Sequence, residues 1–124
     1  MGDNKIFQSS YNSTDGILTG TVLLKSVDKD DSKKIFELMS QGINENASYT
    51  DYILDTRNVT DIKLESFGYL MKAQSIVKKT AGYMVLVVTD ESLQKFMVIY
   101  PEMFDYYAVF FNTEDARKFI ISKR

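Results

Sequence analysis

Apolar residues along this chain gather in short runs, and stretches with helical spacing of apolar positions separate the runs. Two of the runs are continuous. They are Ile53–Leu54, which Tyr52 precedes, and Met84–Val88, which Tyr83 precedes, and each is too short for a buried helix. Continuous runs of this kind between helices are typical of strands that are covered on both faces. We therefore predict that the two runs are adjacent parallel strands at the centre of a sheet.

Three further stretches are rich in β-branched, aliphatic or aromatic residues. They predict a short edge strand at Lys5–Tyr11, a second strand at Ile17–Leu24 and a last strand at Tyr106–Phe111. The segment Asn12–Gly16 has the residue types of a tight turn and would join the first two strands as a hairpin. Gly20 lies inside the second strand and indicates a bulge or a close backbone approach.

Four stretches carry apolar residues at the spacing of amphipathic helices. Asp28, Asp61 and Asn112 precede three of these stretches and are predicted to be their N-caps. Pro101 blocks continuation of the remaining one. The four helices are predicted from Asp28 to about Asn44, from Asp61 to Gly82, from about Glu91 to Ile99, and from Asn112-Thr113 to near the C-terminus.

The order of these elements is two strands followed by alternating helices and strands. Such alternation predicts an α/β fold with a four- to five-stranded, mostly parallel or mixed sheet and about four helices. A length of 124 residues fits a single domain, with its core at about residues 5–122, and it is enough to bury a substantial core.

Composition limits the classes of function. The chain has no cysteine and no histidine, so thiolate metal sites and the common catalytic triads lack their usual members. We therefore expect no enzyme, no metal and no cofactor. Its 15 basic and 17 acidic residues are scattered, which does not favour a nucleic-acid partner. No apolar run approaches the roughly 20 residues of a transmembrane segment, and the first residues are polar, so we expect a cytoplasmic protein.

Several short segments, together with the order of the elements, resemble the STAS domain, the fold of the bacterial anti-sigma factor antagonists. A related branch with Sec14-type features has the same signature. The resemblance covers most of the chain and implies a bacterial signal-transduction module that binds a protein partner, a kinase-type anti-sigma factor. The segments that carry it are Leu18–Val22 (LTGTV), Ile53–Asp55 (ILD), Val59–Ile62 (VTDI), Gly68–Leu70 (GYL) and Phe110–Ala116 (FFNTEDA).

The resemblance also implies a switch at the start of the second helix. Family members are controlled there by phosphorylation of a serine in an Asp-Ser-Ser-Gly motif. Alignment on Gly68–Leu70 places Lys63, Leu64, Glu65 and Ser66 at the four motif positions. Glu65 thus occupies the switch position, Ser66 comes one residue late, and the flanking acid and glycine are absent. We predict that Ser66 is not efficiently phosphorylated.

Charged residues near this helix start each allow two interpretations. An anion at a helix start is stabilised by unpaired N–H groups and the helix dipole, so Glu65 is either a permanent stand-in for the phosphate or an ordinary exposed acid. Asp55 ends a central strand and either meets a ligand or accepts N–H bonds from the turn that follows. Arg57 either contacts an anion through its forked donors or is a solvated surface arginine.

These considerations predict a partner-binding face. It would contain the switch and partner-binding residues Asp55, Arg57, Asp61, Lys63, Glu65 and Ser66, with the Asp90-Glu91 turn on the same edge. A candidate apolar patch follows further along the chain, at Tyr100, Met103 and Phe104. The alternative function is that of a carrier or sensor which binds a small apolar or anionic ligand, a lipid or a nucleotide, between sheet and helices.

Overall fold

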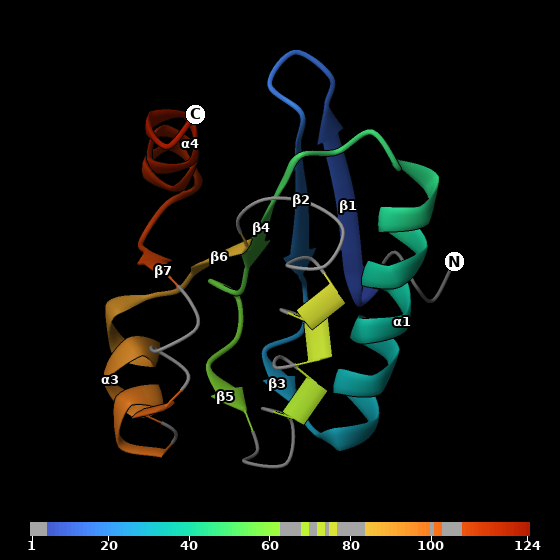
Figure 1. Cartoon of the computed structure of the whole chain (residues 1–124). Helices are drawn as coiled ribbons and strands as arrows, with labels where there is room; N and C mark the ends of the chain where they lie inside the picture. Colours follow the sequence, from blue (N-terminus) through green and yellow to red (C-terminus); the bar gives the residue numbers. More distant parts are fainter. Residues whose placement is uncertain are drawn as a thin grey trace.

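The computed structural model describes residues 5–62, 68–69, 72–73, 75–76, 84–99, 101–102 and 108–124 (Figure 1). The described parts of residues 68–76 are helical, in the region of the predicted second helix. Three helices have defined bounds there: α1 (Lys29–Glu45), α3 (Asp90–Ile99) and α4 (Thr113–Ser122). The strands are β1 (Phe7–Asn12), β2 (Ile17–Val22), β3 (Ser26–Val27), β4 (Asp51–Asp55), β5 (Asp61–Ile62), β6 (Met84–Val87) and β7 (Ala108–Phe110).

Five of the strands form one mixed sheet in the order β1-β2-β4-β6-β7. β1 is antiparallel to β2, and every other neighbouring pair is parallel. Ile53 pairs with Val85 and Leu54 with Leu86, and all residues of β4 and β6 are buried. The predicted central pair of parallel strands is confirmed.

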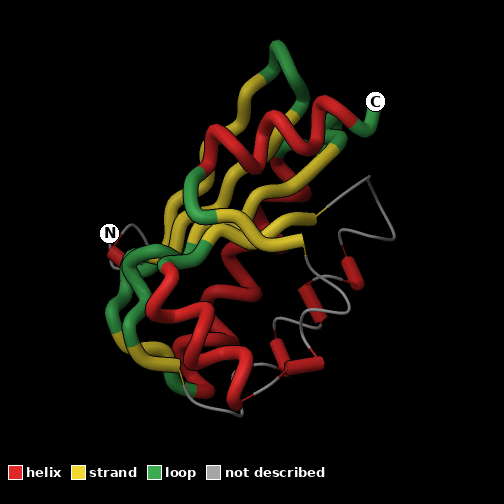
Figure 2. Tube along the Cα trace, turned by 90° about the vertical axis from the view of Figure 1, so that its left-hand side faces the viewer, coloured by secondary structure: helices red, strands yellow, loops and turns green. Residues whose placement is uncertain are grey.

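Side chains of the central strands alternate between two cores. Leu54 and Leu86 point into a cluster that includes Met39 of α1. Ile53 and Val85 point to the other side and pack with the buried residues of α4. The sheet is therefore covered on both faces, which explains why these strands are continuously apolar. Figure 2 shows α4 lying across the strands on the side that faces the viewer.

Two positions in the hairpin of β1 and β2 require glycine, one because of its backbone conformation and the other because of close packing. Gly16 has a φ of 74°, in the left-handed region that glycine adopts at little cost, and its N–H bonds the carbonyl of Asn12 at 2.8 Å. A Cβ at Gly20 would overlap the hydroxyl of Tyr52 and the ring of Phe7. Of the two interpretations of Gly20, the close approach is the one that the structure shows.

The predicted caps at Asp28 and Asn112 are confirmed. Asp28 accepts a 2.8 Å hydrogen bond from the N–H of Asp31, whose carboxylate accepts in return from the N–H of Asp28. Asn112 accepts a 2.8 Å bond from the N–H of Asp115 at the start of α4. The predicted cap at Asp61 is wrong, because Asp61 lies in β5 and pairs with Ser26 of β3.

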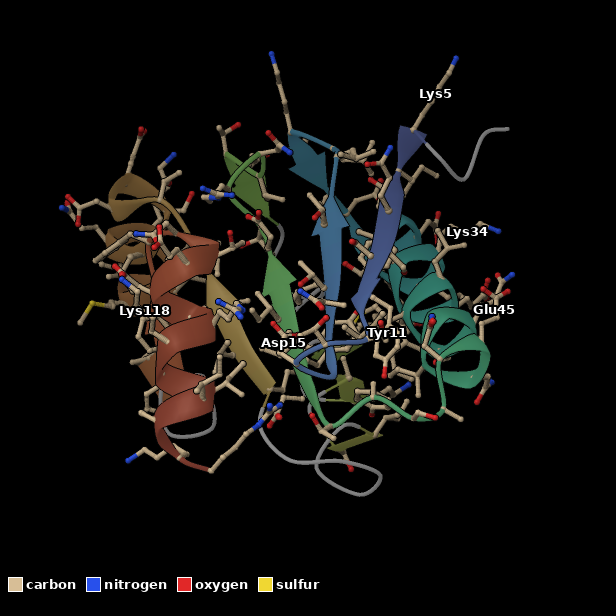
Figure 3. All side chains as sticks on the ribbon, turned by 90° about the horizontal axis from the view of Figure 1, so that it is seen from above. Lys5, Tyr11, Asp15, Lys34, Glu45 and Lys118 are labelled. Carbon is tan, nitrogen blue, oxygen red and sulfur yellow. The ribbon has the colours of Figure 1, made fainter. Side chains whose placement is uncertain are left out.

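Two ion pairs attach α4 and the residue after its C-cap to the β1–β2 turn and to the start of β4. Arg117 Nε donates to Asp15 Oδ2 at 2.5 Å, and Arg124 Nη2 donates to Asp51 Oδ2 at 2.7 Å. The two carboxylates are almost fully buried, whereas both arginines are more than a third exposed. Figure 3 shows Asp15 of the hairpin turn on the side toward α4. Within the described residues, none of the helices combines the length and apolarity that a membrane span requires.

Candidate functional site

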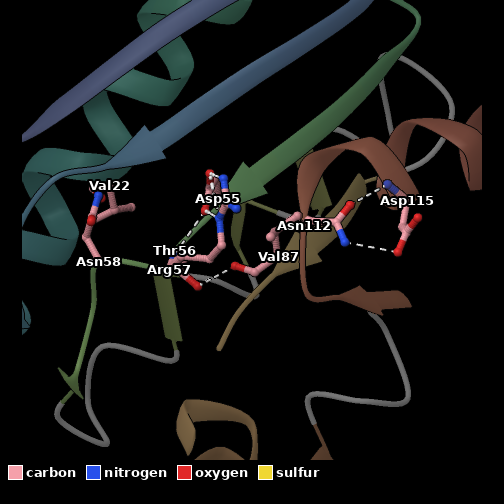
Figure 4. Close-up of polar contacts among 8 residues, drawn as sticks. All are labelled: Val22, Asp55, Thr56, Arg57, Asn58, Val87, Asn112 and Asp115. Carbon is pink, nitrogen blue, oxygen red and sulfur yellow. Dashed lines mark hydrogen bonds and ion pairs between the residues drawn. The ribbon is translucent and has the colours of Figure 1, made fainter. Parts of the chain in front are cut away.

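The carboxyl ends of the parallel strands meet at one edge of the sheet, where sites of open α/β folds are usually built. The β4–β5 loop (residues 56–60) crosses this edge directly after the buried strand β4. Figure 4 draws Thr56, Arg57 and Asn58 of the loop, with Val22 on β2 and Val87 on β6. We consider this loop, with Asp55 before it and the start of α3 beside it, as the candidate site.

Asp55 and Arg57 form a two-pronged ion pair at the start of the loop. Arg57 donates from Nη2 to Oδ2 of Asp55 at 2.8 Å and from Nε to Oδ1 at 3.0 Å, and its backbone N–H donates to Oδ1 at 3.1 Å (Figure 4). The Asp55 side chain is 8% exposed and that of Arg57 is 43% exposed. The hydrogen bond to Asp55 raises the pKa of Arg57 and outweighs the opposing effect of partial burial.

This geometry agrees with the interpretation of Asp55 as a turn former. Its carboxylate accepts from the backbone and side chain two residues on, so it acts as the turn former. The Nε and Nη2 donors of Arg57 are engaged by Asp55, while the rest of the guanidinium faces solvent. A partner at this point would therefore meet an ion pair whose charges are already balanced.

Two further loop residues bind the ends of both neighbouring strands. Thr56 donates to the carbonyl of Val87 on β6 from its N–H at 2.8 Å and from its hydroxyl at 2.9 Å. Asn58 Nδ2 donates to the carbonyl of Val22 on β2 at 3.1 Å. Sequence reasoning missed both contacts, although residues of these types after a strand are common turn formers. The loop is thereby held from two sides.

The second half of the loop is attached to α3. The hydroxyl of Ser92 donates to the carbonyl of Val59 at 3.0 Å, and Lys95 Nζ donates to the carbonyl of Thr60 at 3.2 Å. The N–H of Thr60 also bonds the carbonyl of Lys25 at 2.8 Å. The loop and the start of α3 therefore lie together, and Asp90 and Glu91, which were predicted to form a turn at this edge, are the first residues of that helix. No feature of the sequence pointed to Ser92 or Lys95.

The loop presents polar groups outward while its inner residues are buried. Arg57, Asn58, Thr60 and Asp61 are exposed, whereas Val59 is only 2% exposed. The remaining predicted residues cannot be placed in this arrangement, because Lys63, Glu65 and Ser66 of the switch and Tyr100, Met103 and Phe104 of the apolar patch lie outside the described residues. Asp55, Arg57 and Asp61 are the predicted residues that the structure brings to this edge.

An apolar cavity of about 40 Å³ lies behind the loop. A cavity that holds one water needs only ~10–15 Å³, whereas an engineered cavity that binds benzene measures ~150 Å³. The cavity is lined by Val22, Val27, Ser32, Ile35, Phe36, Met39, Leu54, Thr56, Val59, Tyr69, Ala73, Leu86 and Phe96.

Among the described residues, no group of three or more acidic side chains is arranged to hold a metal ion.

Comparisons with known proteins place this fold. No protein-family model and no curated protein matches the chain. The anti-sigma factor antagonist SpoIIAA in its unphosphorylated form superposes with a TM-score of 0.70 at 14% sequence identity, over 94% of this chain and 96% of that chain. The Bacillus cell fate determinant SpoIIAA in its phosphorylated form superposes with a TM-score of 0.63 at 14% identity, over 92% of this chain and 98% of that chain. The chain therefore has the STAS-type fold of an anti-sigma factor antagonist, as its sequence resemblance predicted.

Proposed function

We propose that this protein is a non-catalytic regulatory module that acts by binding a protein partner, a kinase-type anti-sigma factor. The observation that carries the proposal is the β4–β5 loop, whose buried bonds hold an exposed polar surface at the carboxyl edge of the sheet. The likeness in fold to an anti-sigma factor antagonist supports the same class of function.

The construction of the loop favours binding over catalysis. The side chains of Thr56, Asn58 and Ser92 all donate hydrogen bonds to backbone carbonyls, and Asp55 is paired with Arg57. Groups engaged in this way stabilise the loop and are not poised for proton transfer or nucleophilic attack. A surface that is ordered before docking also loses little conformational entropy when a partner binds.

In this proposal the partner contacts both the loop and the start of the second helix. SpoIIAA has been solved in unphosphorylated and phosphorylated forms. In this chain Glu65 supplies a negative charge that no phosphatase removes, and Ser66 is not efficiently phosphorylated. The affinity for the partner would then not be controlled by phosphorylation of this serine.

Isothermal titration calorimetry against the kinase-type anti-sigma factors encoded in the same genome tests the proposal. Asp61→Lys and Glu65→Lys should each weaken binding by about tenfold or more, because a reversed charge opposes docking at a complementary surface. At the predicted start of the second helix, a lysine in place of Glu65 costs only about 1 kcal/mol of stability, and Asp61 is an exposed residue of β5, so the fold should survive both substitutions. Glu45→Lys at the end of α1, on the side away from α3 and α4 in Figure 3, is the matched control and should bind normally.

Two results would contradict the proposed function. One is that none of these anti-sigma factors binds the unmodified protein. The other is that both Asp61→Lys and Glu65→Lys, with intact melting curves, bind as tightly as the control. Either result would direct attention to a different face of the molecule.

The alternative function, a carrier or sensor of a small ligand, has the apolar cavity as its support. At about 40 Å³ this cavity has no room for a lipid chain or a nucleotide unless it expands. Native mass spectrometry of the purified protein separates the two functions. A bound lipid or nucleotide would favour the carrier, and the bare polypeptide mass would favour the interaction module.

A further inference from the structure

The last turn of α3 is apolar in every direction. Phe96 points into the core and is 5% exposed, but the three residues after it are exposed: Met97 by 55%, Val98 by 83% and Ile99 by 45%. Successive helical residues are about 100° apart, so these side chains cover both flanks and the outer face of the helix. A surface helix normally carries polar residues on its outer face. This turn therefore lacks the polar face that solvent exposure requires.

The beginning of the same helix is polar on its outer face. Glu91, Gln94 and Lys95 are exposed, and Val98 follows them at the spacing that places all four on one side of the helix. We call Glu91, Gln94, Lys95, Met97 and Val98 the α3 outer face. It changes from charged to apolar within two turns.

The α3 outer face is continuous with the candidate site. Lys95 donates to the carbonyl of Thr60, and Ser92 on the inner side of the helix donates to the carbonyl of Val59. A molecule that docks on the loop therefore meets the outer face of α3 without crossing a gap. The exposed apolar turn lies farther along the same surface, next in sequence to the predicted patch at Tyr100.

Charges at the two ends of α3 restrict its partner. Asp90 and Glu91 at the start of the helix and Glu102 beyond its end are exposed acids, and Lys95, 3.5 Å from Glu91, is the one basic residue in the described part of residues 90–102. An acidic border opposes an anionic membrane or a nucleic acid. A two-fold dimer through this face would set the same acids against themselves. A partner with apolar side chains flanked by lysine or arginine has the complementary charge.

We propose that the α3 outer face is a second part of the docking surface, which receives an apolar patch with a basic border on the partner protein. The inference rests on the proposed function, because the partner is the same anti-sigma factor that contacts the β4–β5 loop. Loop and helix then have different tasks. The loop supplies polar contacts, and Val98 and Met97 supply apolar surface that is removed from water on docking.

Substitution of Val98 by serine tests this assignment with little effect on folding, because the side chain is 83% exposed. We expect Val98→Ser to weaken binding of the anti-sigma factor by about tenfold or more, as for a residue at the centre of an interface. Ile121→Ser on α4 is the matched control, since Ile121 is also an exposed aliphatic residue, at 40%. It should bind like the unmodified protein. Circular dichroism melting of both variants checks the fold.

The outcomes separate the inference from the function on which it rests. If Asp61→Lys weakens binding but Val98→Ser does not, the docking role of α3 is wrong and the proposed function stands. If no kinase-type anti-sigma factor binds, both are wrong. Analytical ultracentrifugation and cosedimentation with phosphatidylserine–phosphatidylcholine vesicles should show a monomer that stays in solution. Self-association or vesicle binding that Val98→Ser abolishes would assign the face to a second copy or to a membrane and would overturn the proposal.

Discussion

Replacing Tyr52 with phenylalanine should stabilise this protein, because the hydroxyl of Tyr52 is buried without compensation. The side chain is 0% exposed, and its Oη has no hydrogen-bond partner among the described residues. Burial raises the pKa of Tyr52 above its ordinary value, and the neighbouring Tyr49 raises it further, so the hydroxyl is protonated at neutral pH. Removing the oxygen therefore removes an unpaired dipole and no charge.

The magnitude follows from the cost of that burial. Burying a hydroxyl without a hydrogen bond costs about 1–3 kcal/mol in protein mutational data. The substitution removes this cost, but the small void left by the oxygen loses packing contacts and so reduces the gain in stability. We expect the free energy of unfolding to rise by about 1 kcal/mol, which corresponds to roughly 3–5 °C in Tm for a domain of this size. Tyr11→Phe on β1 removes the same atom from a half-buried tyrosine and should change stability by less than about 0.5 kcal/mol.

Urea unfolding followed by circular dichroism measures both variants, and the slope with denaturant should stay unchanged. A loss of about 0.5 kcal/mol or more in Tyr52→Phe would show that the hydroxyl has a partner, and the reasoning would be wrong. Gly20→Ala provides a second check, because its new methyl would overlap that hydroxyl. It should cost about 1–3 kcal/mol alone and less when combined with Tyr52→Phe.

Three further predictions concern the charged residues and the switch. Arg57→Ala should lower the free energy of unfolding by about 1–3 kcal/mol, less than for a fully buried pair because water reaches Arg57, and a loss below about 0.5 kcal/mol in urea unfolding would contradict a structural role for the pair with Asp55. Burial raises the pKa of Asp15, but its bonds to Arg117 and to a backbone N–H outweigh this and hold the pKa below 3.8. This carboxylate therefore adds stability above its unfolded pKa that is lost as pH falls through its folded pKa, so the unmodified protein should lose stability below about pH 4 more steeply than Asp15→Asn, and equal slopes would refute the assignment. Intact-mass analysis of protein from its native cell should show no stoichiometric phosphate on Ser66, and finding one there would move the switch by one residue.

The parts of the fold that could be predicted are those where a local pattern has one physical solution. Continuous apolar runs as short as those of β4 and β6 must be buried on both faces, which places them at the centre of the sheet. Asp28 and Asn112 precede apolar stretches of helical spacing and bond their own third neighbours, so the cap and its partner are close in sequence. Little knowledge of tertiary contacts is needed to predict either the central strands or the two caps.

The short strands β3 and β5 could not be predicted, because each is two residues long and carries no periodicity. Asp61 has the residue type of a helix cap, but its backbone pairs with Ser26, a residue 35 positions earlier. The same holds for the contacts of the β4–β5 loop. Thr56 reaches a carbonyl 31 positions away and Asn58 one 36 positions away. Such contacts depend on which strands are neighbours, and local sequence does not contain that information.

The pairing of Asp55 with Arg57 changes which residues give this edge its charge. From the sequence both were candidates for contact with a charged ligand, and in the structure they neutralise one another within the loop. The acids that stay exposed at the edge are Asp61 on β5 and Asp90 and Glu91 at the start of α3, and Lys95 lies 3.5 Å from Glu91. An interface built here has a balanced centre and an acidic border. Because exposed charges are screened by salt, association with a basic partner should slow as ionic strength rises, while the loop itself keeps its shape.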